Sequence, residues 1–135
     1  MRFLADAQVL VWYVTDPDRL TARAVAAMQA SIDDEEPVGV SAFSLVELAY
    51  AAEKKSNAIG SGQFTSILAV VHDPESPFEV LSVDSAVGER VRYVPRTVNA
   101  DPGDRIIVAT AEVHGLAVIS SDSLVAEMTD QEIIW

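Results

Sequence analysis

The chain has 135 residues, half of them hydrophobic, which suits one domain with a hydrophobic core and excludes disorder for the bulk of it. The net charge of −12 argues against a broad phosphate-binding face, and the lack of cysteine excludes disulfides, thiolate metal sites and thiol nucleophiles. No apolar run approaches the ~18–20 residues that span a bilayer. Asp6 also comes too early for a secretory signal. We therefore expect a cytoplasmic protein with no membrane partner.

The first half of the chain alternates short strand patterns with helix patterns. A turn at 15–18 and an acidic loop at 33–37 separate these segments, and residues 56–62 break the helical pattern again. We expect short strands at 2–5 and 38–40, and helices at 8–14, at 21–32 and from Ser41 or Ser44 to about Lys55.

The second half of the chain repeats this alternation. We expect helices at 64–71, 84–93, 102–113 and directly after Asp122, and strands at 78–83, 116–119 and 133–135, the last as an edge strand. Short strands that alternate with helices, with few hairpin turns, predict a parallel sheet with helices on its faces. Ligands bind such sheets outside the carboxyl ends of the strands.

One helix start carries two carboxylates three residues apart. Pro102 suits the first helical position, because its missing N–H would have had no partner there. Asp101 then falls at the N-cap, and Asp104 lies in the first turn, where the helix dipole favours negative charge. Capping accounts for Asp101, whereas Asp104 is the acid that we expect to serve a site.

Three more acids occupy similar junctions. Asp6 and Asp122 each follow a strand, and capping of the next helix is an adequate alternative for each of them. Glu47 projects from a mostly apolar helix face, where a carboxylate needs a cation or a donor. A capping box formed by Ser44 and Glu47 is the alternative there. Together with Asp104, these acids are expected to share one crevice.

Clustered carboxylates predict a metal site. Each one raises the proton affinity of the others unless a cation intervenes. Hard oxygen ligands without cysteine or a histidine pair suit Mg²⁺ or Mn²⁺ rather than zinc, and neither His72 nor His114 has a metal-ligand spacing. Such a site activates water for in-line attack on a phosphodiester.

Five segments, in this order and at this spacing, resemble the PIN-domain family, in particular the VapC-like toxins of type II toxin–antitoxin pairs. The segments are residues 3–12, 40–47, 101–111, 116–122 and 133–135. The resemblance implies a three-layer α/β/α fold with a short-stranded, mainly parallel central sheet, and residues 1–135 as a single PIN-like domain.

The resemblance also implies an activity and its partners. It implies an endoribonuclease that uses Mg²⁺ or Mn²⁺, in which metal-activated water hydrolyses RNA. The metal ligands and catalytic residues would be Asp6, Glu47, Asp104 and Asp122. Hydroxyl groups of Ser120 and Thr110 would support substrate binding. A cognate antitoxin would lie over the site, and a homodimer is the usual assembly.

Several positions depart from the family pattern. Gln8, Gly103 and Ser121 replace residues that are more usual there, the last two an aromatic and a basic residue. Arg105 and Arg96 are then the nearest candidates for phosphate contacts, by proximity alone.

Arg105 has a purely structural alternative, an ion pair with Asp101. The acidic charge and the few basic groups also leave open an alternative function, a catalytically weak or inactive PIN-like protein-interaction module. A DNA-directed nuclease is a weaker possibility, because the chain lacks basic insertions that would thread DNA.

Overall fold

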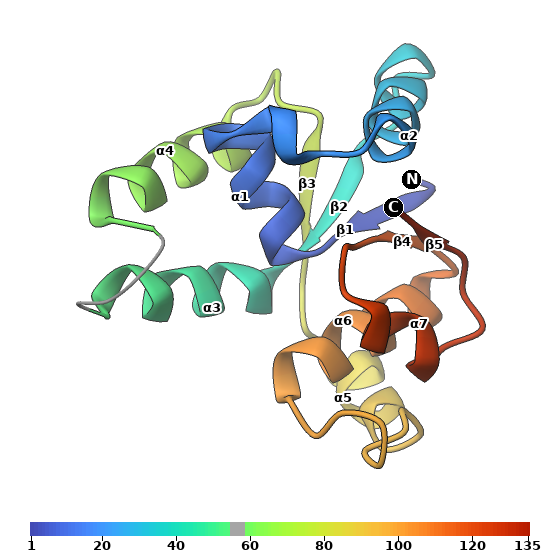
Figure 1. Cartoon of the computed structure of the whole chain (residues 1–135). Helices are drawn as coiled ribbons and strands as arrows, with labels where there is room; N and C mark the ends of the chain where they lie inside the picture. Colours follow the sequence, from blue (N-terminus) through green and yellow to red (C-terminus); the bar gives the residue numbers. More distant parts are fainter. Residues whose placement is uncertain (55–58) are drawn as a thin grey trace.

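A five-stranded parallel sheet forms the centre of the molecule. The computed structural model describes residues 1–54 and 59–135, and the strand order is β3-β2-β1-β4-β5 (Figure 1). The strands are β1 Phe3–Ala5, β2 Val38–Ser41, β3 Phe78–Leu81, β4 Ala117–Ile119 and β5 Ile133–Ile134. All four pairings are parallel, and the last strand lies at an edge, as the sequence predicted.

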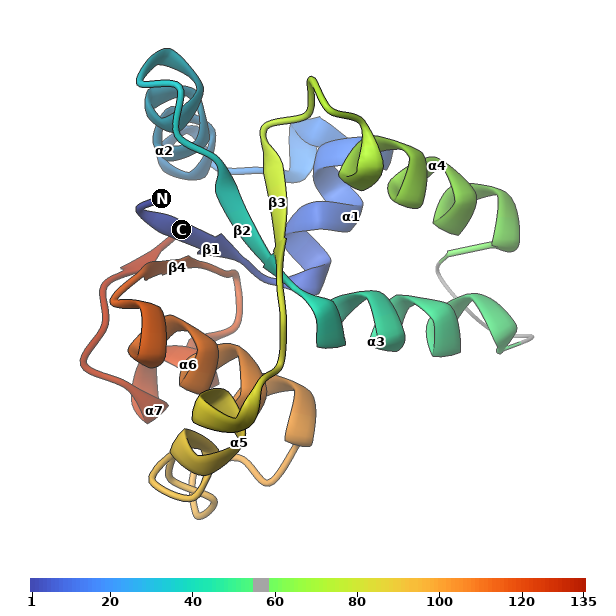
Figure 2. The ribbon, with the colours of Figure 1, turned by 180° about the vertical axis from the view of Figure 1, so that it is seen from behind.

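Helices cover both faces of this sheet. The α-helices are α1 Ala7–Thr15, α2 Ala22–Asp33, α3 Ala42–Glu53, α4 Ser61–His72, α5 Ser85–Val91, α6 Pro102–His114 and α7 Ser123–Met128, with a 3-10 turn η1 at Pro17–Arg19. Figures 1 and 2 show α1, α2 and α4 on one side of the strands and α5, α6 and α7 on the other (Figure 2). No helix in the described part of the chain is long and apolar enough to cross a membrane.

The strand side chains alternate between two hydrophobic layers, as the period of a strand requires. Leu4 and Val118 pack with buried residues of α5, α6 and α7, whereas Ala5 and Ile119 pack with those of α1, α2 and α4. All four of these side chains are fully buried. The predicted α/β architecture with a parallel sheet between two helical layers is therefore confirmed.

Side-chain caps fix most helix starts, and they correct one prediction. Ser41 accepts a hydrogen bond from the backbone of Phe43 and begins α3, so Ser44 lies inside the helix and the proposed Ser44–Glu47 capping box is wrong. Gly115 ends α6 in the left-handed region at φ 67°, as predicted for a C-cap glycine. The predicted end of α3 at Lys55 and residues 56–58 of the predicted break at 56–62 lie outside the described residues. The end of that break is wrong, because α4 begins at Ser61 and not at residue 64.

Candidate active site

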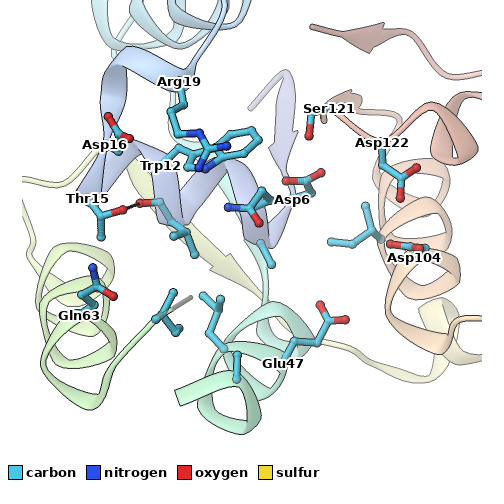
Figure 3. Close-up of a pocket in the computed structure, with 17 residues that line it drawn as sticks. Asp6, Trp12, Thr15, Asp16, Arg19, Glu47, Gln63, Asp104, Ser121 and Asp122 are labelled. Atoms are coloured by element: carbon cyan, nitrogen blue, oxygen red, sulfur yellow. Dashed lines mark hydrogen bonds between the residues drawn. The ribbon is translucent and has the colours of Figure 1, made fainter. Parts of the chain in front are cut away.

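Four carboxylates from separate segments line one cavity of about 940 Å³ at the carboxyl edge of the sheet (Figure 3). They belong to Asp6 after β1, Glu47 in α3, Asp104 in α6 and Asp122 after β4. The parallel topology causes this convergence. Strands β1 and β4 end at the same edge, and α6, which leads into β4, begins there. The expected shared crevice is thus present.

Asp6 and Asp122 serve as helix caps and as cavity residues at once. Asp6 Oδ1 accepts a hydrogen bond of 2.8 Å from the backbone N–H of Val9, and Asp122 Oδ1 accepts one of 2.9 Å from Leu124. Capping uses one carboxylate oxygen of each side chain and holds the carboxylate at a fixed position. The predicted capping and site roles are therefore compatible.

Glu47 depends on a missing side chain opposite it. A Cβ atom built at Gly103 would overlap Glu47 Oε1 and would lie only 2.7 Å from Glu47 Cδ. The carboxylate of Glu47 therefore occupies the space that any larger residue at the start of α6 would fill. The departure from the family pattern at Gly103 leaves room for the carboxylate of Glu47 in the position that it holds here.

Asp104 is positioned by a residue that was overlooked in the sequence. Asn99 Nδ2 donates a hydrogen bond of 2.6 Å to Asp104 Oδ2, while Asn99 Oδ1 accepts from the backbone of Asp101. Asp101 in turn caps α6 by accepting hydrogen bonds from Gly103 and Asp104, as predicted. The spacing of an asparagine two residues before the cap was the available clue, since Asn often bonds the backbone in this way.

Burial and mutual repulsion raise the pKa of three of these acids. Burial raises the pKa of Glu47 to about 7, with further contributions from Asp101, Asp104 and Asp6. Burial and the charges of Asp101 and Asp122 also raise the pKa of Asp104. Burial is the largest cause for Asp6 too, while the hydroxyl of Ser120 and backbone N–H groups oppose the rise.

The donor set suits a hard divalent cation. All four side chains offer carboxylate oxygens, and none forms a salt bridge with a basic residue of the described chain. Within residues 1–54 and 59–135, no three acidic or histidine side chains lie close enough to share one ion as they stand. The residues fit a divalent metal by the chemistry of their donors, while their spacing in this structure is wider than a single ion needs.

Comparison with known proteins identifies the family. A family model described as the PIN domain matches residues 3–130. The chain belongs to the PIN domain family. Ribonuclease VapC22 of Mycobacterium tuberculosis is 29% identical to it over 119 residues, which cover 88% of this chain and 85% of that protein.

Solved structures share the PIN fold over nearly all of the chain. VapBC2 from Rickettsia felis, bound to a promoter DNA fragment, superposes with a TM-score of 0.72 at 12% identity, covering 98% of this chain and 97% of the other. A toxin–antitoxin complex from Klebsiella pneumoniae gives 0.57 at 19% identity, covering 89% and 86%. At these identities the likeness concerns the fold.

The PIN fold keeps the predicted substrate-binding residues away from the cavity lining. Thr110 is fully buried and donates to the carbonyl of Ile106, and Ser120 is 1% exposed. Arg105 donates to the carbonyls of Val91 and Val94, at 2.8 and 3.1 Å. The alternative ion pair between Arg105 and Asp101 is also absent from the described residues.

The cavity contains residues that sequence reasoning missed. Trp12, Thr15, Arg19 and Gln63 line the part of the cavity built by α1, η1 and α4. No motif marks them, because Arg19 reaches Trp12 only through the turn at η1 and Gln63 belongs to a distant helix. The arginine that lines the cavity is therefore Arg19 and not Arg105, the one adjacent to Asp104 in sequence.

Proposed function

We propose that this PIN domain protein is a divalent-metal-dependent endoribonuclease and the toxin of a toxin–antitoxin pair. The observation that carries the proposal is the convergence of four carboxylates from four segments on one cavity. Two of them are fixed by helix caps, and Glu47 of α3 lies against Gly103 at the start of α6, next to Asp104 in sequence. Capping accounts for the positions of two of these acids but not for the whole set, because burial and neighbouring carboxylates raise the pKa of Asp6, Glu47 and Asp104.

Asp6, Glu47, Asp104 and Asp122 would hold the metal, Mg²⁺ or Mn²⁺. When bound, the ion would lower the pKa of water and neutralise charge on the scissile phosphate. The protein's own contribution is to bring these carboxylates from four segments to one cavity and to restrain them there. Asn99 orients Asp104, the caps restrain Asp6 and Asp122, and the bare backbone of Gly103 makes room for Glu47.

The relatives support the substrate and the partner. One is named a ribonuclease, and a structural neighbour is a toxin–antitoxin complex. We infer that this chain, folded as a single domain over residues 1–135, acts on RNA in the cytoplasm, forms a homodimer and is held by a cognate antitoxin.

A matched pair of variants tests the activity. Asp6→Asn should abolish cleavage of single-stranded RNA in the presence of Mn²⁺ while the fold survives, because asparagine also caps helices well. Asp84→Asn changes the same type of cap, at the start of α5 and outside the cavity, and should cut RNA as the parent does. Equal cleavage by Asp6→Asn and the parent would refute the assignment.

Metal titration separates the enzyme from the alternative interaction module. Calorimetry of the parent with Mn²⁺ should show binding that is lost in Asp6→Asn and kept in Asp84→Asn. A parent that binds no Mn²⁺ but binds the product of a neighbouring gene tightly would favour the module, for which the net charge of −12 is the supporting observation.

A further inference from the structure

Arg19 is the single basic side chain that lines the cavity, counting lysine, arginine and histidine of the described residues. It is exposed, and no salt bridge joins it to a carboxylate in the described part of the chain. By contrast, Arg2, Arg23 and Arg90 all pair with carboxylates elsewhere on the surface. The guanidinium N–H groups of Arg19 are therefore available to an anionic ligand in the cavity.

An aromatic stack holds this arginine in place. The guanidinium carbon of Arg19 lies 4.9 Å from the centroid of the Trp12 ring, and Figure 3 shows the two side chains overlapping (Figure 3). Trp12 in turn packs against Trp135, with 5.4 Å between ring centroids and 36° between ring planes. A guanidinium stacked on a supported indole is pre-organised and loses less conformational freedom when it binds.

Helix α1 connects this stack to the carboxylates. Asp6 caps the helix at its start, and Trp12 lies six residues further, roughly 9 Å along the helix axis at 1.5 Å per residue. Gln8 and Val11 line the cavity between them. A chain of phosphates that passes the carboxylates would therefore meet Arg19 at a neighbouring nucleotide.

We propose that Arg19, stacked on Trp12, is a nucleotide-binding subsite for single-stranded RNA, next to the carboxylates. This inference rests on the proposed ribonuclease function and names the part of the cavity that grips the substrate beyond the scissile phosphate. The planar guanidinium binds a phosphate through its N–H groups and offers its free face to a base. Thr15 and Gln63 supply further hydrogen-bonding groups in the same part of the cavity.

The charge pattern disfavours an acidic protein segment as the ligand of Arg19. Apart from Arg19, the charged side chains that line the cavity are the four carboxylates and Asp16, and these repel an acidic peptide. An RNA strand is also an anion, but a metal at the carboxylates would attract its phosphates, and stacking contributes about 1–3 kcal/mol per base. Arg19 then provides the second anchor that a cavity with so few cations requires.

The test measures RNA affinity in the Asp104→Asn background, so that the probe is not cut. A short fluorescent single-stranded RNA is titrated with Mn²⁺ present, at several salt concentrations. Arg19→Gln should weaken binding about tenfold, because a charge-assisted hydrogen bond is lost. It should also lower the slope of log affinity against log salt by about 0.7, the value for one contact to a single-strand phosphate.

The chain offers a matched control for this change. Arg92 also stacks on an aromatic ring, 5.0 Å from the centroid of Tyr93, but does not line the cavity. Arg92→Gln removes the same charge and should leave both affinity and salt slope at the parent values. Both tryptophans of the chain, Trp12 and Trp135, lie at this stack, so RNA should change the intrinsic fluorescence of the parent and change it less in Arg19→Gln.

The outcomes separate this inference from the proposed function. If the parent cuts RNA but Arg19→Gln binds it with unchanged affinity and salt slope, the subsite is refuted and the ribonuclease stands. If the parent cuts no RNA while binding still depends on Arg19 and not on Arg92, the subsite stands and the ribonuclease falls. Displacement of the RNA by polyglutamate as readily as by unlabelled RNA would assign Arg19 to an acidic protein segment and overturn the inference.

Discussion

The two parts of the cavity solve opposite electrostatic problems. Around Glu47 and Asp104, half-buried carboxylates lie near other negative charges, and the pKa of each rises through burial and this repulsion. Around Arg19, a single cation rests on the face of Trp12 and stays exposed to solvent. The carboxylate cluster is electrostatically unfavourable without a bound cation, whereas the contact between Arg19 and Trp12 is favourable without any ligand.

This difference indicates how catalysis and RNA binding are divided between the two ends of α1. Burial and like charge shift the pKa of these carboxylates away from the ordinary value, which is typical of a reacting centre. The stacked arginine is built like a binding contact, with its geometry set before the ligand comes. Variants of the carboxylates should therefore change cleavage and pH behaviour, and variants near Arg19 should change RNA affinity.

The largest expected effect comes from the paired acids at the start of α6. Asp104→Asn should reduce RNA cleavage by about 1000-fold, more than the 10- to 100-fold typical of residues that only support a metal ligand. Asp101→Asn keeps the cap, because asparagine accepts the same backbone hydrogen bonds, and should change cleavage by less than about tenfold. Cleavage rates with saturating Mn²⁺ measure both, and equal losses would contradict the division between cap and ligand.

The next effect concerns stability and its dependence on pH. The pKa of Glu47 is raised to about 7 from 4.5, so the folded protein holds a proton there that the unfolded chain releases. Stability of the metal-free protein therefore falls as the pH rises from about 4.5 to about 7, by about 2 kcal/mol once solvent screening is allowed for. Glu47→Gln, which cannot ionise, should be more stable than the parent by that amount at pH values above about 7.

Urea unfolding in EDTA measures this difference. It should shrink toward zero below about pH 4.5, where Glu47 is protonated in both states. Glu53→Gln, which removes an exposed carboxylate at the end of the same helix, is the matched control for the loss of one negative charge. If Glu47→Gln and the parent differ by the same amount at every pH, burial and the neighbouring carboxylates do not raise the pKa of Glu47.

The acidic part of the cavity was predictable from sequence, and the reason is local. Asp6 and Asp122 each follow a short strand, and the parallel sheet implied by the element order brings such ends to one edge. Helix starts with an aspartate cap were equally predictable, because capping is a contact between neighbours in sequence, whereas the start of α4, whose cap residue is Gly60, was placed three residues too late. The choice between Ser41 and Ser44 required the structure, since both serines precede the same apolar run.

The other part of the cavity was not predictable, because it depends on contacts between distant segments. Trp12 reads in sequence as one more apolar residue of α1, and its neighbour Trp135 lies at the other end of the chain. Proximity to Asp104 along the sequence favours Arg105 as a phosphate contact. Its side chain instead donates to the carbonyls of Val91 and Val94, at and just after the end of α5. Proximity in sequence does not determine the direction of a long flexible side chain.

A tenfold effect is expected from the glycine between the two acids of α3 and α6. Gly103→Ala should displace the carboxylate of Glu47 and weaken Mn²⁺ binding about tenfold, the lower end for losing the support of a ligand. Gly88→Ala, in α5, meets nothing within 4 Å and should keep the parent affinity while stabilising its helix by about 0.5–1 kcal/mol. Calorimetry measures both, and equal affinities for the two variants would show that Glu47 needs no such space.

The smallest effect should come from Arg105, which separates structural from RNA-binding arginines. Its guanidinium bonds the carbonyls of Val91 and Val94 and so joins α6 to the end of α5. Arg105→Lys cannot satisfy both carbonyls through the same planar group, and it should cost about 1 kcal/mol in urea unfolding. RNA affinity and its salt slope should stay at the parent values, in contrast to Arg19→Gln.

The decisive comparison for RNA binding is Arg105→Gln, which removes the charge. Arg105→Lys keeps the charge, so its salt slope would stay unchanged even if Arg105 bound a phosphate. A slope lowered by about 0.7 in Arg105→Gln would return the phosphate contact to the residue that proximity in sequence first suggested.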